Sequence, residues 1–117
     1  MVLLYSTITL LTNQKKMIDI KICNLRYTKP SQPYDIKVCR RSSILGNPYY
    51  LEDESDRDTV CDKYSIWFEE QLSVFTPELT RILKLGKKYG KLRLFCWCYP
   101  LRCHAETIKA WLLKEDK

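Results

Sequence analysis

A cluster of thiols and one imidazole near the C-terminus is the strongest chemical signal in the sequence. Cys96, Cys98 and Cys103 are three of the six cysteines, and His104 is the only histidine. Alternate side chains of a strand point to the same face, so Cys96 and Cys98 should share one side of a strand. Cys103 and His104 fall where the next helix should begin, at the positive end of its dipole. The pattern therefore predicts a site where a strand ends and a helix begins.

The chemistry of this cluster has three interpretations, which the sequence leaves open. The four side chains form a complete tetrahedral zinc set, but the sulfurs of Cys-X-Cys lie far apart and adjacent helical residues diverge by about 100°. We therefore expect no metal. Alternatively, Cys103 is a thiolate favoured by the helix start and His104 is a general base, and we take these two as candidate catalytic residues. In the third interpretation Cys96 and Cys98 are small core residues, and His104 is a hydrogen-bonded helix cap.

A second polar cluster lies in the segment Arg41-Ser42-Ser43-Ile44-Leu45-Gly46-Asn47-Pro48. An arginine offers a two-pronged fork to phosphate, and an asparagine side chain offers a donor and an acceptor together. Gly46 can adopt a positive φ, and Pro48 keeps Asn47 extended, so the turn should be rigid. We predict that this segment recognises a phosphate or a base. The alternative is that Asn47 only braces its turn and Arg41 is solvated.

Arg57 is a further candidate cation. It stands at the start of a helical pattern, close behind the acidic residues Asp53 and Glu54. It is therefore either a phosphate ligand or an exposed partner of one of these acids.

Alternating and helical patterns predict a small α/β domain with a partly parallel sheet of three to four strands and helices packed on it. The apolar alternation predicts strands that begin at Ile18 and at Ile36. A third strand, 92–97, should be nearly buried on both faces. Helical spacing predicts helices at 57–74, from Thr76-Pro77 to Gly86, and at 104–115.

The size and composition of the chain set its broad class. With 117 residues the chain suits one domain; we predict that 17–117 form this domain and that 1–16 are an extension or an edge strand. A net charge of +6 weakly favours anionic partners. Six unevenly placed cysteines do not fit a secreted disulfide scaffold, which indicates free thiols in the cytoplasm. The apolar N-terminus is too short for a membrane span.

Three segments in combination resemble the domain of unknown function 4326 family of bacteria and bacteriophages. They are residues 41–49 with Gly-Asn-Pro, Arg57 with Lys63-Tyr64, and residues 96–104 with Cys-Trp-Cys and Cys-His. The resemblance covers about residues 18–113 and implies a phage or phage-derived protein, but no reaction. Family members often carry Gly-Asp after Cys-His. Ala105-Glu106 stand there in this chain, which keeps the carboxylate and makes Glu106 a candidate ligand-binding residue.

The exits of the predicted strands bring these candidates together. In open α/β sheets ligands bind outside the carboxyl ends of the strands, here residues 24–26, 40–47 and 96–104. We predict a pocket that binds an anionic, nucleotide-like small molecule, with or without turnover, and needs no cofactor. The alternatives are a nucleic-acid-binding accessory protein and a small zinc-binding domain, and the oligomeric state stays open. The predicted ligand-binding residues are Arg41, Ser43, Gly46, Asn47, Arg57, Cys98 and Glu106.

Overall fold

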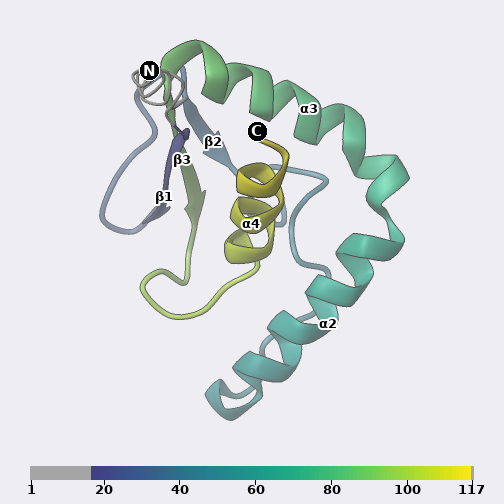
Figure 1. Ribbon diagram of the computed structural model, residues 1–117. Helices are drawn as coiled ribbons and strands as arrows, with labels where there is room; N and C mark the ends of the chain where they lie inside the picture. Colours follow the sequence, from purple (N-terminus) through teal and green to yellow (C-terminus); the bar gives the residue numbers. More distant parts are fainter. Residues whose placement is uncertain (1–16, 117) are drawn as a thin grey trace, which may run out of the picture.

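The sheet described within residues 17–116 has three strands, and all of them are parallel. The structure is a computed structural model that describes residues 17–116, so the predicted extension 1–16 lies outside the described residues. Strand β3 (Lys91–Cys96) lies between β1 (Asp19–Asn24) and β2 (Asp35–Lys37) (Figure 1). The predicted α/β class and the central position of the third strand are confirmed.

The central strand supplies much of the core. Leu92, Leu94 and Phe95 are fully buried, as the apolar run predicts. Arg93 interrupts this run, and its guanidinium forms two hydrogen bonds of 2.7 Å with the carboxylate of Asp35 on the neighbouring strand β2. This ion pair ties the short edge strand to the centre of the sheet.

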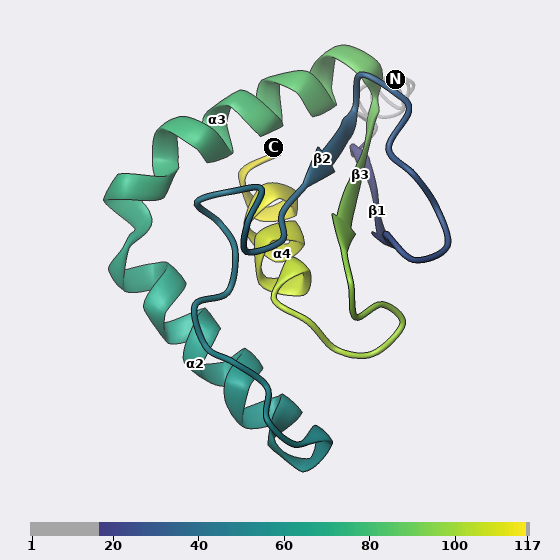
Figure 2. The same cartoon turned by 180° about the vertical axis from the view of Figure 1, so that it is seen from behind.

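The three α-helices described in residues 17–116 lie to one side of the sheet in both views of the molecule (Figures 1 and 2). A short 3₁₀ turn, η1 (Glu54–Asp56), leads directly into α2 (Arg57–Glu70), which is followed by α3 (Leu72–Tyr89). The last helix, α4 (Ala105–Glu115), follows β3. Helices α3 and α4 pack on the central strand, and α4 also packs on β1. Helix and sheet thus form two layers around one core.

The boundary between α2 and α3 differs from the prediction. The break falls at Gln71, and Pro77 lies inside α3. Thr76 is not a helix cap, because its hydroxyl donates to the carbonyl of Leu72 one turn earlier, at 2.7 Å. The Thr-Pro pair resembles a helix start, but burial of Phe75 favours a continuous helix through this point.

The end of α3 also differs from the prediction. Gly86 lies inside the helix, where an added Cβ would lie 2.9 Å from the Leu92 side chain. The helix ends instead at Gly90, which has φ of 76° and donates its N–H to the Gly86 carbonyl at 2.7 Å. A left-handed residue of this kind is the common way to end a helix.

Two loops meet at the edge of the sheet where the strands end. Residues 38–47 leave β2, and residues 97–104 leave β3. The Tyr64 hydroxyl on α2 donates to the Leu45 carbonyl at 2.6 Å, which anchors the first loop. The Asn24 side chain at the end of β1 donates to the carbonyls of Trp97 and Tyr99, which braces the second loop. Both loops are therefore held to the scaffold at the place where ligands bind in this class of fold.

Candidate functional site

A pocket of about 310 Å³ lies between these two loops and the first turn of α2. Its volume is at the lower end of the range of about 300–1,000 Å³ found for small-molecule sites. Asn47, Arg57, Cys98, Cys103 and His104, all predicted site residues, line the pocket. Three separate parts of the chain thus supply it.

Five of the six cysteines line this pocket, namely Cys39, Cys61, Cys96, Cys98 and Cys103. All are free thiols. The Sγ atoms of Cys96 and Cys103 lie 3.2 Å apart, in the buried floor of the pocket. The pair therefore joins the end of β3 to the start of α4 through direct thiol contact.

Cys98 has the environment that best stabilises a thiolate. The Cys103 thiol first, and then the Arg57 guanidinium, lower the pKa of Cys98 to about 6, although partial burial opposes them. The pKa of Cys103 is instead raised, by Cys96, Cys98 and burial. The expectation that the helix start favours a thiolate at Cys103 is therefore wrong. Both thiols line the pocket, but Cys103 is buried, whereas Cys98 is half-buried.

His104 is held as a neutral imidazole. Its Nε2 lies 2.6 Å from the carbonyl oxygen of Val38, which can only accept, so Nε2 carries the proton. Burial lowers the pKa of His104, in spite of this hydrogen bond, and the charge of Arg40 lowers it further. Its ring also packs edge-on against Tyr64. The unprotonated nitrogen is consequently Nδ1. The side chain does not cap α4 by a hydrogen bond, in contrast to the third interpretation of the sequence.

Arg40, rather than the predicted Arg41, lines the pocket. Its Nε donates to the carbonyl of Asn47 at 2.8 Å, and its Nη2 donates to the carbonyl of Tyr49 at 3.2 Å. Its guanidinium carbon lies 4.0 Å from the centre of the Tyr50 ring. Within residues 17–116 no carboxylate pairs with Arg40. The Arg40 guanidinium is therefore held in place at the pocket, and no carboxylate in the described part of the chain neutralises its positive charge.

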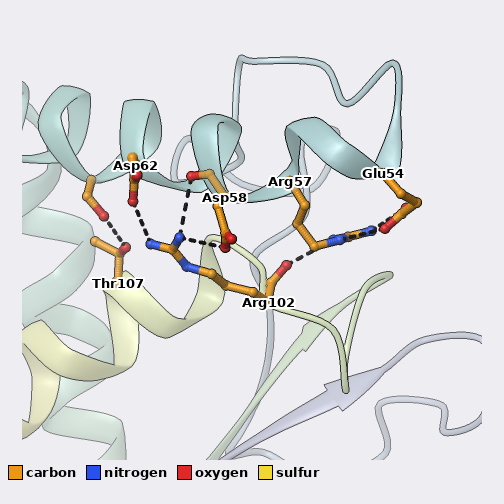
Figure 3. Close-up of polar contacts among 7 residues, drawn as sticks. Glu54, Arg57, Asp58, Asp62, Arg102 and Thr107 are labelled. Carbon is orange, nitrogen blue, oxygen red and sulfur yellow. Dashed lines mark hydrogen bonds and ion pairs between the residues drawn. The ribbon is translucent and has the colours of Figure 1, made fainter.

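Arg57 is a structural cation as well as a pocket residue. Its Nε and Nη2 donate to the Glu54 carboxylate at 2.9 and 2.7 Å, and its Nη1 donates to the Arg102 carbonyl at 2.9 Å (Figure 3). The glutamate first raises the pKa of Arg57 above its ordinary value. The pairing with Glu54 was one of the two expected roles. Arg57 also acts on Cys98, so it links α2 to the thiol cluster.

Arg102 is a second arginine that holds the loop after β3 against α2. Its Nη1 lies 3.0 Å from the Asp58 carboxylate, and its Nη2 lies 2.9 Å from that of Asp62 (Figure 3). In the first turn of α4, the Thr107 hydroxyl lies 2.8 Å from the hydroxyl of Ser65 on α2. These contacts fix the position of the cysteine loop relative to the first turns of α2.

Four predicted site residues do not line the pocket. Arg41 is exposed on a neighbouring groove, and Glu106 is exposed on a separate surface of α4. Ser43 accepts from the backbone N–H of Leu45 and shapes the loop. Gly46 has no positive φ; it is required because an added Cβ would lie 2.3 Å from the Arg40 Cα. Ser43 and Gly46 thus position Arg40 and Asn47.

Other lining residues were not singled out from the sequence. They are Cys39, Arg40, Tyr49, Tyr50, Leu51, Val60, Cys61, Trp97 and Arg102. Gly-Asn-Pro marked the loop correctly, but the choice between two adjacent arginines depends on which side of the loop faces the pocket. No periodic pattern encodes this in an irregular segment.

Within residues 17–116 no group of three or more Cys, His, Asp or Glu side chains is arranged to hold a metal ion. The expectation of no zinc stays a prediction for direct measurement.

The fold and the site define a small α/β domain with three parallel strands and a cationic, thiol-lined pocket at the carboxyl ends of β2 and β3. The chain belongs to the family described as Domain of unknown function (DUF4326), whose model matches residues 23–114. No curated protein and no solved structure matches the chain significantly. None of the helices described in residues 17–116 is long and apolar enough to cross a membrane.

Proposed function

We propose that the pocket binds an anionic, nucleotide-like small molecule. The observation that carries this proposal is Arg40, a lining cation that pairs with no carboxylate within residues 17–116, in a pocket whose lining contains no carboxylate. A concave site with uncompensated cationic side chains attracts anions, because low-dielectric walls strengthen the field inside it.

Arg40 is the residue that binds the anion in this proposal. Two backbone carbonyls hold its Nε and Nη2, so Nη1 is left for a ligand. Arg57 and Arg102 are already paired with Glu54, Asp58 and Asp62. A guanidinium that is held in place loses little conformational entropy when it binds, and a hydrogen bond between charged groups is among the stronger polar contacts. Arg40 thus replaces Arg41 as the proposed phosphate ligand.

Aromatic side chains at the rim support a ligand with a flat ring. Tyr50 and Trp97 line the pocket and are 69% and 62% exposed. Large aromatic side chains with this exposure stack well on nucleobases. The Asn47 side chain can also form a hydrogen bond with the ligand. Its Oδ1 accepts from the Tyr49 N–H, so its Nδ2 is the group left to donate to a base or a ribose.

His104 and Cys98 extend the chemical capacity of the site. Nδ1 of neutral His104 is an acceptor, and the Cys98 thiolate is a nucleophile. The proposal requires neither to act in turnover, since each contact named above is a binding contact. A reducing cytoplasm, which the cysteine usage favours, would keep these thiols free.

Isothermal titration of the reduced protein with AMP, adenosine and inorganic phosphate tests the proposal. We expect AMP to bind more tightly than adenosine or phosphate alone. Arg40→Gln should weaken AMP binding roughly tenfold or more, which corresponds to the loss of a hydrogen bond between charged groups. Arg41→Gln removes the same charge one residue away, outside the pocket, and should leave AMP binding unchanged. Equal losses in the two variants, or no AMP binding by the unmodified protein, would contradict the proposal.

A further inference from the structure

A basic groove adjoins the pocket and shares part of its wall. The groove has a volume of about 700 Å³, and Cys39, Arg40 and Trp97 line both cavities. Its remaining walls come from the loop after β1 and from the exit of β2. The groove therefore lies along the carboxyl ends of all three strands, and it shares three lining side chains with the pocket.

The lining of this groove is cationic. It contains Lys29, Lys37, Arg40 and Arg41, and it contains no carboxylate. Within residues 17–116 none of these four cations forms an ion pair. By contrast, the arginines on the opposite side of the pocket are neutralised by the acidic residues of η1 and α2 (Figure 3). The uncompensated charge thus continues from the pocket in one direction only, into the groove.

An exposed indole stands at the junction. Trp97 is 62% exposed, although it follows directly after a buried strand. A cationic channel that tracks phosphates, with an aromatic ring on which a base stacks, is the combination by which proteins hold single-stranded nucleic acid. A duplex presents its bases only at the groove edges, so the indole would have no base face to stack on.

We propose that the pocket and the groove together bind the end of a single-stranded nucleic acid. The terminal nucleotide occupies the pocket, Trp97 stacks on the adjacent base, and Lys29, Lys37 and Arg41 contact the following phosphates. This inference rests on the proposed nucleotide binding and names its substrate class. It also assigns a place to Arg41, which the sequence marked as a ligand residue and which lies outside the pocket.

Fluorescence anisotropy with a ten-nucleotide oligo-dT, labelled at one end and phosphorylated at the other, tests this inference. The oligonucleotide should bind more tightly than AMP, with steep salt dependence. The double variant Lys37→Gln/Arg41→Gln should weaken oligonucleotide binding roughly threefold to thirtyfold and reduce the salt slope, and should leave AMP binding intact. The matched control is Lys84→Gln/Lys87→Gln, which removes two exposed charges from α3, outside both cavities, and should have little effect.

The indole is tested separately. Trp97→Ala should weaken oligonucleotide binding, and Trp97→Phe should restore most of it, because a phenyl ring still stacks. Oligonucleotide binding no tighter than that of AMP, equal losses in the two double variants, or equal affinity for a duplex of the same length would overturn the inference. If one of these outcomes occurs and Arg40→Gln still weakens AMP binding, only this inference fails, and the proposed nucleotide binding by the pocket stands. Failure of AMP to bind at all would instead remove the basis of both.

Discussion

The Nε2 atom of His104 lies 2.6 Å from the carbonyl oxygen of Val38, although 66 residues separate the two in sequence. This buried hydrogen bond joins the exit of β2 to the start of α4 and sets the distance between the two loops that enclose the pocket. It also fixes the tautomer of the only histidine. The contact is therefore structural, and it leaves Nδ1 as the nitrogen available for chemistry.

The first prediction concerns the pH dependence of stability. Burial lowers the pKa of His104 below its ordinary value of 6.5. Below about pH 6.5 the unfolded chain takes up a proton that the folded chain does not, so the free energy of unfolding should fall as the pH falls towards the folded-state pKa. Urea unfolding at pH 7.5 and 5.5 measures this loss, and His104→Gln should show a smaller one. Identical pH dependence in the variant would mean that the histidine titrates normally.

The same hydrogen bond gives a second prediction. His104→Phe keeps a ring of similar size but leaves the buried Val38 carbonyl without its donor. An unsatisfied buried polar group costs about 1–3 kcal/mol, and we expect a loss of this size in urea unfolding at pH 7.5. A loss below about 0.5 kcal/mol, the usual range of a neutral surface change, would show that water replaces the imidazole.

The third prediction concerns thiol reactivity. The pKa of Cys98 is lowered to about 6 by Cys103 and Arg57, whereas burial raises the pKa of Cys23. Alkylation by iodoacetamide at pH 7, followed by peptide mass spectrometry, should modify Cys98 several-fold faster than Cys23, since the thiolate is the reactive species. The rate at Cys98 should rise with pH to a midpoint near 6.

Arg57→Gln supplies the control for that experiment. It removes a cation next to Cys98, so the midpoint should move to higher pH. An unchanged midpoint would show that the guanidinium does not stabilise the thiolate, and equal rates at Cys98 and Cys23 would remove the case for a reactive thiol here.

A fourth prediction ranks the two arginines that hold the cysteine loop to α2. The side chain of Arg57 is 15% exposed and donates to a backbone carbonyl, whereas the partners of Arg102 are 82% and 66% exposed. Exposed ion pairs contribute about 0–1 kcal/mol. Arg102→Ala should therefore cost less than 1 kcal/mol, with an effect that shrinks in high salt, and Arg57→Ala should cost more. The reverse order in chemical denaturation would contradict the arrangement in Figure 3.

The fifth prediction compares two glycines. An added Cβ at Gly46 would lie 2.3 Å from the Arg40 Cα, whereas at Gly90 it would meet nothing within 4 Å. Gly90→Ala should thus cost only the left-handed backbone penalty of about 1–2 kcal/mol. Gly46→Ala should cost more, because backbone must move, and should also weaken anion binding through Arg40. Equal destabilisation of the two variants in thermal and chemical unfolding would contradict this close approach.

The sequence by itself determined the elements with strong patterns. Alternation of apolar residues located β1 and β2, and an apolar run located β3. The glycine, asparagine and proline of residues 46–48 marked the loop beside the pocket. Patterns of this kind are local: they depend on the periods of the strand and the helix and on backbone preferences, which neighbouring residues fix. Thr76-Pro77 shows the limit of such local patterns. The pair is typical of a helix start, but it lies inside α3 next to the buried Phe75.

Only the tertiary structure decided how the chemical groups are distributed. Adjacent arginines are equivalent in sequence, yet Arg40 lines the pocket and Arg41 lines the groove. Cys98, rather than Cys103, has the environment of a thiolate, because the Cys103 thiol and then the Arg57 guanidinium lower the pKa of Cys98, whereas Cys96, Cys98 and burial raise the pKa of Cys103. Distances between segments far apart in the chain determine these properties, and they arise only when parallel strands bring their carboxyl ends to one edge.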